Sequence, residues 1–158
     1  MPDLTKNFDQ LFEQYSRGFN TSTHNAATRV DLMKSVPRDK GVYLMWEKDS
    51  DRPFYIGSAG KIQRAFPPDN NIGFNQSNIR SRLFQATTPY HFDETVLYYG
   101  PTTPGVPPNG YRFNVNLCKT KIICMIVPFP NAPSALEHLL IQGFINKFGN
   151  LPEANQKI

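Results

Sequence analysis

Cysteine is scarce in this chain, because only Cys118 and Cys124 occur among 158 residues. The two thiols flank one strand-like run, and two residues of one strand cannot readily form a disulfide. A structural zinc site needs more ligands at tighter spacing, and His24, His91 and His138 are scattered along the chain. The pattern argues against a disulfide scaffold and a zinc module, and it predicts two buried free thiols.

Long apolar runs are lacking as well. The N-terminal segment "MPDLTKNFDQLF" has no apolar stretch of signal-peptide length, and no run approaches the roughly 20 residues that span a bilayer. We therefore expect a cytoplasmic protein with no membrane partner. Charge of one sign is not in large excess either, with 17 Lys and Arg against 13 Asp and Glu. The net charge of +4 leans toward polyanions such as nucleic acids, but many unrelated soluble proteins share it.

The length of 158 residues, with 39% hydrophobic and 13% aromatic content, predicts one folded domain. Hydrophobic periodicity predicts helices at residues 4–17, 25–34, 77–86 and 133–149. Strand-like composition predicts strands at residues 41–48, 53–58, 95–100, 111–118 and 121–129, the last apolar enough to be buried on both faces. This order predicts an α+β fold on a small, largely antiparallel sheet.

The stretch "GVYLMWEKDSDRPFYIGSAGK", residues 41 to 61, reads as an antiparallel hairpin with one tyrosine in each strand. Alternation places Val42, Leu44 and Trp46 on one face and Tyr43 on the other. In the second strand, it places Phe54 and Ile56 together, with Tyr55 and Gly57 opposite. The two hydroxyls then emerge on the same side, and Gly57 leaves room for a backbone or a ligand. The alternative is a pair of packed aromatic side chains.

Glu137 stands out in the last predicted helix. At ~100° per residue, it falls inside the apolar arc, between Phe144 and Phe148. A carboxylate on a buried side costs several kcal/mol unless a charged or hydrogen-bonding group meets it. Glu137 is then either half of an internal salt bridge or a metal ligand or tuned acid at the floor of a cleft.

The helix predicted at residues 77–86 offers a partner for that carboxylate. Arg80 and Arg82 project to different sides of its apolar stripe, and Arg82 lies at the border of the stripe. A guanidinium there can pair with Glu137 or hold a phosphate in a bidentate fork.

Five short segments together carry a family resemblance. They are "GVY" at 41–43, "FYIG" at 54–57, "NIRSRL" at 78–83, "ALEHLLI" at 135–141 and "LPEAN" at 151–155. In this order, they resemble the successive motifs of the GIY-YIG nuclease family. The resemblance implies a single domain over 1–158, with an N-terminal helical extension (1–40) and a motif-bearing core (41–155). It also implies a three-stranded antiparallel sheet flanked by helices.

The resemblance assigns roles residue by residue. Tyr43, Tyr55 and Gly57 match the two tyrosines and the glycine of the first two motifs. Arg82 matches the arginine, Glu137 the metal-binding glutamate, and Asn155 the late asparagine. The link between Gly57 and the arginine helix is longer than in many members, which leaves Arg64 and Arg80 as rivals for Arg82. The segment from Glu137 to Asn155 is also longer than usual.

The implied reaction is metal-dependent hydrolysis of DNA, with double-stranded DNA as the partner. Glu137 would hold Mg²⁺, with Mn²⁺ able to substitute, and Arg82 would neutralise a phosphate oxygen. Tyr55 would orient the attacking water or take its proton. A phenol ordinarily has a pKa near 10, so base work needs a nearby cation, for which Lys61 is one choice and an ordinary surface lysine the alternative.

Two loops, residues 65–78 and 101–110, are either tolerated surface insertions or recognition elements. Asn75 and Asn78 are of a type that reads base edges, which would suit a small restriction-type endonuclease. A repair, mobile-element or toxin nuclease remains open, as do a catalytically silent nucleic-acid-binding module and a protein in which Glu137 and Arg82 are structural. A homodimer on DNA is the simplest route to a double-strand cut. The stripe Phe8, Leu11, Phe12 and Tyr15 would serve either that contact or the core.

Overall fold

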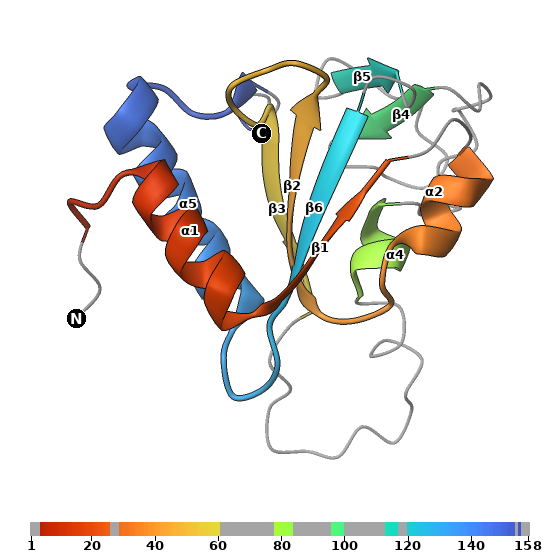
Figure 1. The fold of residues 1–158 in the computed structure, drawn as a ribbon, viewed down its shortest axis with the longest axis horizontal. Coiled ribbons are helices and arrows are strands. Elements are labelled where there is room, and N and C mark those ends of the chain that lie inside the picture. Colours follow the sequence, from red (N-terminus) through yellow and green to blue (C-terminus); the bar gives the residue numbers. More distant parts are fainter. Residues whose placement is uncertain are drawn as a thin grey trace, which may run out of the picture.

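A computed structural model of the chain describes residues 4–25, 29–60, 78–83, 96–99, 113–116, 120–153 and 155. Helices and strands are mixed along the chain, which confirms the α+β class (Figure 1). In chain order the elements are α1 (Phe8–Gly18), β1 (Asn20–His24), α2 (Arg29–Ser35), β2 (Gly41–Glu47), β3 (Tyr55–Ala59), α4 (Ile79–Leu83), β4 (Val96–Tyr99), β5 (Phe113–Asn116), β6 (Thr120–Ile126) and α5 (Pro133–Phe148).

The main sheet has four strands in the order β1-β6-β2-β3, and every neighbouring pair is antiparallel. β4 and β5 form a separate two-stranded sheet. The prediction of a mainly three-stranded sheet is therefore wrong by one strand. The additional strand is β1, which lies between the first two predicted helices, where no strand was predicted. Its sequence, NTSTH, lacks apolar alternation, as an edge strand without fully buried residues allows. The N-terminal segment thus contributes to the sheet.

β6 lies between β1 and β2, the interior position that its apolar sequence predicts. Gly41 of β2 lies so close to this strand that a Cβ would meet the Met125 carbonyl oxygen at 2.0 Å. Only glycine permits such a close approach between backbones. The register on either side of β2 then sets Tyr43 opposite both Cys124 and Gly57.

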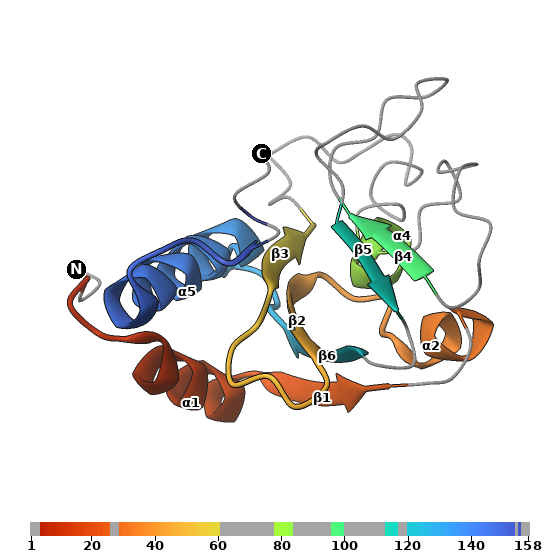
Figure 2. The ribbon, with the colours of Figure 1, turned by 90° about the horizontal axis from the view of Figure 1, so that it is seen from above.

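Helices cover both faces of the main sheet, and Figures 1 and 2 show the resulting three layers. On one face α1 and α5 pack over the side chains of Val42, Leu44 and Trp46. We call this the long-helix face. On the other, α2 and α4 pack over Tyr43 and Met45. We call this the tyrosine face.

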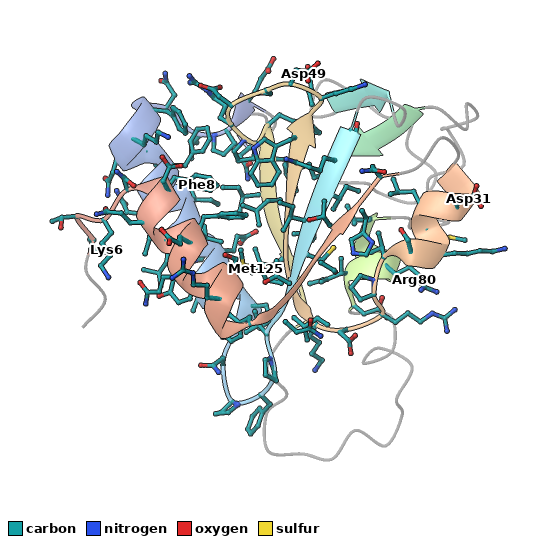
Figure 3. The ribbon with its side chains drawn as sticks, in the orientation of Figure 1. Lys6, Phe8, Asp31, Asp49, Arg80 and Met125 are labelled. Carbon is teal, nitrogen blue, oxygen red and sulfur yellow. The ribbon has the colours of Figure 1, made fainter. Side chains whose placement is uncertain are left out.

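The long-helix face is built on close contact between α1 and α5. A Cβ at Gly143 would lie 2.7 Å from Leu11 Cδ1 and 3.1 Å from the Phe8 nitrogen, so glycine lets the two helices approach. Phe8 points from α1 into this layer (Figure 3). The apolar stripe of α1 packs in this layer. Phe8 and Leu11 are buried, and Phe12 and Tyr15 are partly buried against the same core. Core packing therefore accounts for the stripe.

The ends of these two helices follow their sequence signals. Asn7 and Gln10 form a reciprocal capping box at the start of α1. Pro133 occupies the first turn of α5, and Gly149, with φ of 83°, ends it in the left-handed conformation. Within the described ranges, no helix combines the length and apolarity needed to cross a membrane.

Candidate active site

Tyr43 and Tyr55 lie on the same face of the β2–β3 hairpin, as alternation predicts. Their ring centroids are 5.9 Å apart, with an angle of 30° between the ring planes. Tyr43 is only 4% exposed and belongs to the core of the tyrosine face, whereas Tyr55 is partly exposed beside that core. Of the two phenols, Tyr55 is therefore the one that solvent or a ligand can approach.

Gly57 provides the space in which these rings lie. A Cβ at this position would be 2.7 Å from Cζ and Oη of Tyr43 and 2.7 Å from Cε2 of Tyr55. The room over Gly57, which the sequence predicted for another backbone or a ligand, is occupied by the two tyrosines themselves. Gly57 thus acts on the site through the position of the phenols.

Phe54 does not share a face with Ile56, contrary to the sequence prediction. Ile56 packs on the long-helix face, whereas Phe54 joins Tyr43 and Met45 in the opposite core. β3 begins only at Tyr55, and the Phe54 amide donates to the Met45 carbonyl at 2.7 Å. The alternation that holds within the strand therefore does not extend back to Phe54.

α4 brings the arginine motif to the tyrosine face. Its Ile79 and Leu83 side chains are buried in the same core as Tyr43. The amide of Ile79 donates to the Asp39 carbonyl at 3.0 Å, which ties the start of α4 to the segment before β2. Asn78 directly precedes the helix and is 9% exposed. The backbone of Arg82 therefore lies beside the tyrosine pair, while its side chain is outside the described part.

Arg80 has a different environment. Its Nε donates to the Val36 carbonyl at 2.8 Å, and its Nη2 donates to the Lys34 carbonyl at 3.0 Å. These carbonyls lie at the C-terminal end of α2, where a cation is favourable (Figure 3). The guanidinium thus joins α2 to α4, a structural task that weakens its rivalry with Arg82.

Asn155 is bound to the outer edge of β3. Its Oδ1 accepts from the Ile56 amide at 2.9 Å, and its Nδ2 donates to the Ile56 carbonyl at 2.9 Å. The side chain is 5% exposed, so both bonds are shielded from water. Asn155 takes the place of a neighbouring strand for one residue, between Tyr55 and Gly57, and thereby fixes the part of β3 that carries them.

Glu137 lies at the border of the buried side of α5. The residues buried along this helix are Pro133, Leu136, Leu140, Gly143 and Phe144. The side chain of Glu137 is 20% exposed, and its Oε2 is 3.8 Å from Nε2 of the exposed His138. Helix geometry predicted Glu137 inside the apolar arc. The structure places it at the edge of that arc, half-buried and accessible to solvent.

The carboxylates of the described residues suit a metal ion that is held partly by the protein and partly by a substrate. Among the described residues, no three His, Cys, Asp or Glu side chains cluster as an all-protein metal cage would require. Mg²⁺ is commonly held through one or two carboxylates with waters and substrate phosphates. A single accessible carboxylate such as Glu137 meets that requirement, and a preformed cage does not arise in this part of the chain.

Cys124 is a buried free thiol, as predicted. Burial raises the pKa of this thiol to about 12, so it is protonated and unreactive at neutral pH. Cys118 lies outside the described residues, as do the predicted site residues Lys61, Arg64 and Asn75.

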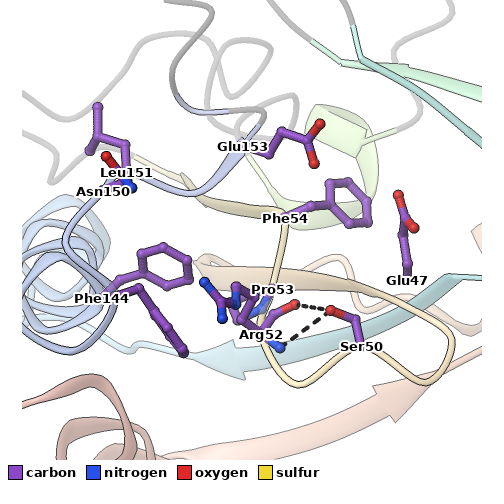
Figure 4. Close-up of a pocket in the computed structure, with 10 residues that line it drawn as sticks. Glu47, Ser50, Arg52, Pro53, Phe54, Phe144, Asn150, Leu151 and Glu153 are labelled. Atoms are coloured by element: carbon purple, nitrogen blue, oxygen red, sulfur yellow. Dashed lines mark hydrogen bonds between the residues drawn. The ribbon is translucent and has the colours of Figure 1, made fainter.

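A cavity that the sequence did not indicate lies beside the turn of the β2–β3 hairpin (Figure 4). It has a volume of about 300 Å³, between the β2–β3 turn and the C-terminal end of α5. Glu47 and Glu153 line it, and the Arg52 guanidinium lies 4.0 Å from the centroid of the Phe148 ring. Its two carboxylates outnumber the one guanidinium, so the cavity does not favour a phosphate.

No protein-family model, curated protein or solved structure matches the chain. The assignment of function therefore depends on the sequence motifs and on the geometry described above. The structure brings Tyr43, Tyr55, Gly57 and Asn155 together and packs α4 on the same face. Glu137 is not part of this group, because α5 packs on the opposite face of the sheet.

Proposed function

We propose that this protein is a metal-dependent DNA endonuclease of the GIY-YIG type. The observation that carries the proposal is the tyrosine pair over Gly57, with the arginine-bearing α4 packed beside it. These motifs are separated in sequence, and a shared site explains why they meet on one face of the sheet. Tyr43 is buried, whereas Tyr55 beside it is partly exposed, so one phenol of the pair is accessible to a substrate.

The chain's own groups have distinct tasks in this proposal. Tyr55 orients the attacking water or takes its proton, since its ring is the more accessible of the pair. Tyr43 supports that ring from the core, and Asn155 holds the intervening strand through Ile56. Asn155 is in this view a positioning residue, since both ends of its amide bind the Ile56 backbone and its side chain is buried.

Glu137 and Arg82 are proposed to meet the phosphate. A divalent cation held by Glu137 would stabilise the charge that develops on the phosphate and on the leaving oxygen. Arg82 would neutralise a non-bridging oxygen. We further propose a cytoplasmic enzyme of the restriction type, which recognises bases through Asn75 or Asn78. It would cut duplex DNA as a dimer.

The test is cleavage of supercoiled plasmid by the purified protein, with Mg²⁺, with Mn²⁺ or with EDTA. Wild-type protein should nick or linearise the plasmid only with the metal. Glu137→Gln should lower the cleavage rate by at least about 100-fold, because it removes the charge that holds the cation. Glu13→Gln is the matched control, since it removes a carboxylate that is 64% exposed on α1.

Thermal melting of the same preparations separates catalysis from folding. A half-buried metal ligand predicts a Glu137→Gln melting temperature close to that of the wild type. If Glu137 only neutralises a buried cation, breaking the pair costs typically about 3–5 kcal/mol, and melting falls by many degrees. An active but strongly destabilised Glu137→Gln protein would end the metal-ligand assignment.

A catalytically silent nucleic-acid-binding module is the second candidate. The engagement of Tyr43 in the core and of Asn155 with backbone favours it, since both serve the fold without any reaction. DNA binding with no metal-dependent cleavage over a range of sequences would support this candidate and remove the enzyme.

A further inference from the structure

A second group of polar side chains lies on β1, away from the tyrosine pair. β1 is the outer strand of the main sheet, and α2 follows it on the tyrosine face (Figure 1). Ser22 is paired in register with Cys124 of the tyrosine-face core, so Ser22 and His24 project to that face. Both residues are half-buried. β6 and β2 separate them from Tyr55 on β3 by about 14 Å, at ~4.8 Å per strand. The group is therefore distinct from the candidate active site.

The hydrogen bonds around His24 decide which ring nitrogen carries the hydrogen. Ser35, the last residue of α2, donates its one hydroxyl proton to the Leu32 carbonyl at 2.8 Å. Its oxygen, 3.2 Å from Nδ1 of His24, therefore accepts the Nδ1 hydrogen. Burial lowers the pKa of His24, so the ring is neutral at neutral pH. Nε2 then has a lone pair, and it accepts the hydroxyl proton of Ser22 at 2.7 Å.

These three side chains form the arrangement that activates a hydroxyl nucleophile. A serine hydroxyl attacks poorly by itself, and it is activated when a base lies about 2.6–3.2 Å away and a third group orients that base. Ser22, His24 and Ser35 meet these conditions in that order. A purely structural role explains the bond from His24 to Ser35, which joins β1 to α2. It does not explain the bond from Ser22 to His24, which joins two residues of one strand and adds no link between elements.

We propose that Ser22 is a nucleophile activated by His24, and that it takes an acyl group from small carboxylic esters. The Ser22 oxygen attacks the ester carbonyl while its proton passes to Nε2 of His24. The bond between the carbonyl carbon and the alcohol oxygen then breaks, and the alcohol leaves with that proton. Water repeats both steps on the acyl-serine and releases the carboxylic acid. Ser35 is a positioning residue, since it acts through the ring of His24.

The position of Ser22 at the sheet edge sets the class of substrate. Alternate backbone N–H groups of an outer strand point away from the sheet, where they can donate to the carbonyl oxygen of a substrate as charge develops on it. The half-burial of Ser22 admits a small acyl group. Esters are favoured over amides because an alcohol leaves more readily than an amine. This inference does not rest on the proposed function, since it uses neither the metal nor the tyrosine pair.

The test is covalent capture of the wild-type protein by an alkyl fluorophosphonate, which bonds to a reactive serine oxygen and releases fluoride. Peptide mapping by mass spectrometry gives the labelling rate at each serine. Ser22 should react at least about 100-fold faster than Ser16 and Ser50, because a positioned base contributes that much or more. Ser16 is half-buried like Ser22, and Ser50 is exposed. Their hydroxyls donate to the carbonyls of Glu13 and Arg52, which cannot take the proton, so they are matched internal controls.

Variants separate activation from accessibility. His24→Gln keeps a polar side chain but removes the base, and it should lower the labelling rate at Ser22 by at least about 100-fold. Ser35→Ala should lower that rate by a smaller factor, and Ser35→Thr, which restores the hydroxyl, should recover it. The same preparations are then treated with p-nitrophenyl acetate. Wild-type protein should release p-nitrophenolate and gain one acetyl group on Ser22, and Ser22→Ala should gain none at this position.

Labelling of Ser22 no faster than that of Ser16 and Ser50 would overturn the inference. This comparison is made within the wild-type protein, so it decides the matter even if a variant fails to fold. A folded His24→Gln protein that is labelled at the wild-type rate would overturn the role of the base. A Ser22 that reacts with the fluorophosphonate but is not acetylated would overturn the assignment to esters. Plasmid cleavage with Mg²⁺ by Ser22→Ala should equal that of the wild type, so the two proposals stand or fall separately.

Discussion

The two faces of the main sheet use the same strands for different purposes. On the long-helix face, α1 and α5 cover Val42, Leu44 and Trp46 with apolar side chains and close helix–helix contact. On the tyrosine face, two shorter helices cover a core that includes two phenols and a thiol. The apolar core of the long-helix face therefore supplies most of the stability of the fold. The tyrosine face can include polar side chains because stability does not depend on it alone.

The largest stability effect should follow from damage to the long-helix face. Leu140 is fully buried there. Leu140→Ala should cost about 2–5 kcal/mol of unfolding free energy, measured by urea denaturation, because it leaves a cavity. Plasmid cleavage measured well below the melting temperature should stay near the wild-type rate. A large loss of cleavage by a folded Leu140→Ala protein would break the division between the faces.

Gly57→Ala tests the tyrosine face. The new methyl group would meet both phenol rings at 2.7 Å, and Tyr43 is held in the core and has little room to yield. Overpacking of this kind costs typically about 1–3 kcal/mol. We expect cleavage to fall by more than this stability loss accounts for, since the rings themselves must move. Normal cleavage at full folding would contradict the role given to the pair.

Asn155 tests the edge between the faces. Asn155→Ala removes both bonds to Ile56 and should cost about 1–2 kcal/mol, since water can reach part of the uncovered edge. Asn155→Asp keeps an acceptor for the Ile56 amide but sets a carboxylate oxygen against the Ile56 carbonyl. A raised pKa in the folded state makes this variant recover stability as the pH falls. Equal melting of both variants across pH 4 to 8 would argue against the observed pairing.

The smallest effect concerns His24 of β1, on the α2 side of the sheet. Its Nε2 is 2.7 Å from the Ser22 hydroxyl, and its Nδ1 is 3.2 Å from the Ser35 hydroxyl, which donates to the Leu32 carbonyl. Burial lowers the pKa of His24, so the unfolded chain binds the proton more readily. Stability should fall slightly as the pH drops below about 6.5, and His24→Gln should flatten that part of the melting profile. An unchanged profile would remove His24 as its source.

The helices of the long-helix face were easier to predict from the sequence than the strand edges and the tyrosine face. The apolar periodicity of α1 and α5 predicted their place, both bounds of α5 to within one residue and the end of α1, since a long buried stripe repeats the same signal over several turns. α1 begins later than predicted, at Phe8. β1 was missed because five polar residues at an edge carry no such repeat. Phe54 was misplaced because alternation was extended beyond the residue where β3 begins.

The candidate site was predictable in part for a similar reason. The neighbourhood of Tyr43 and Tyr55 follows from local alternation in one hairpin, and the border position of Glu137 from one helix. The pairing of Asn155 with Ile56 joins residues 99 positions apart, and no local pattern encodes it. The filled space over Gly57 likewise depends on ring positions that only packing decides.

The bonding of Asn155 to Ile56 also bears on how separate molecules meet. β3 is an edge strand, and exposed edges invite pairing with strands of other chains, the first step toward aggregation. The amide group occupies both hydrogen-bonding positions of Ile56 on that edge, so an incoming strand finds its register interrupted at the middle residue. Asn155 therefore blocks strand addition at Ile56, and a variant without this side chain leaves the Ile56 amide and carbonyl open to a strand of another molecule.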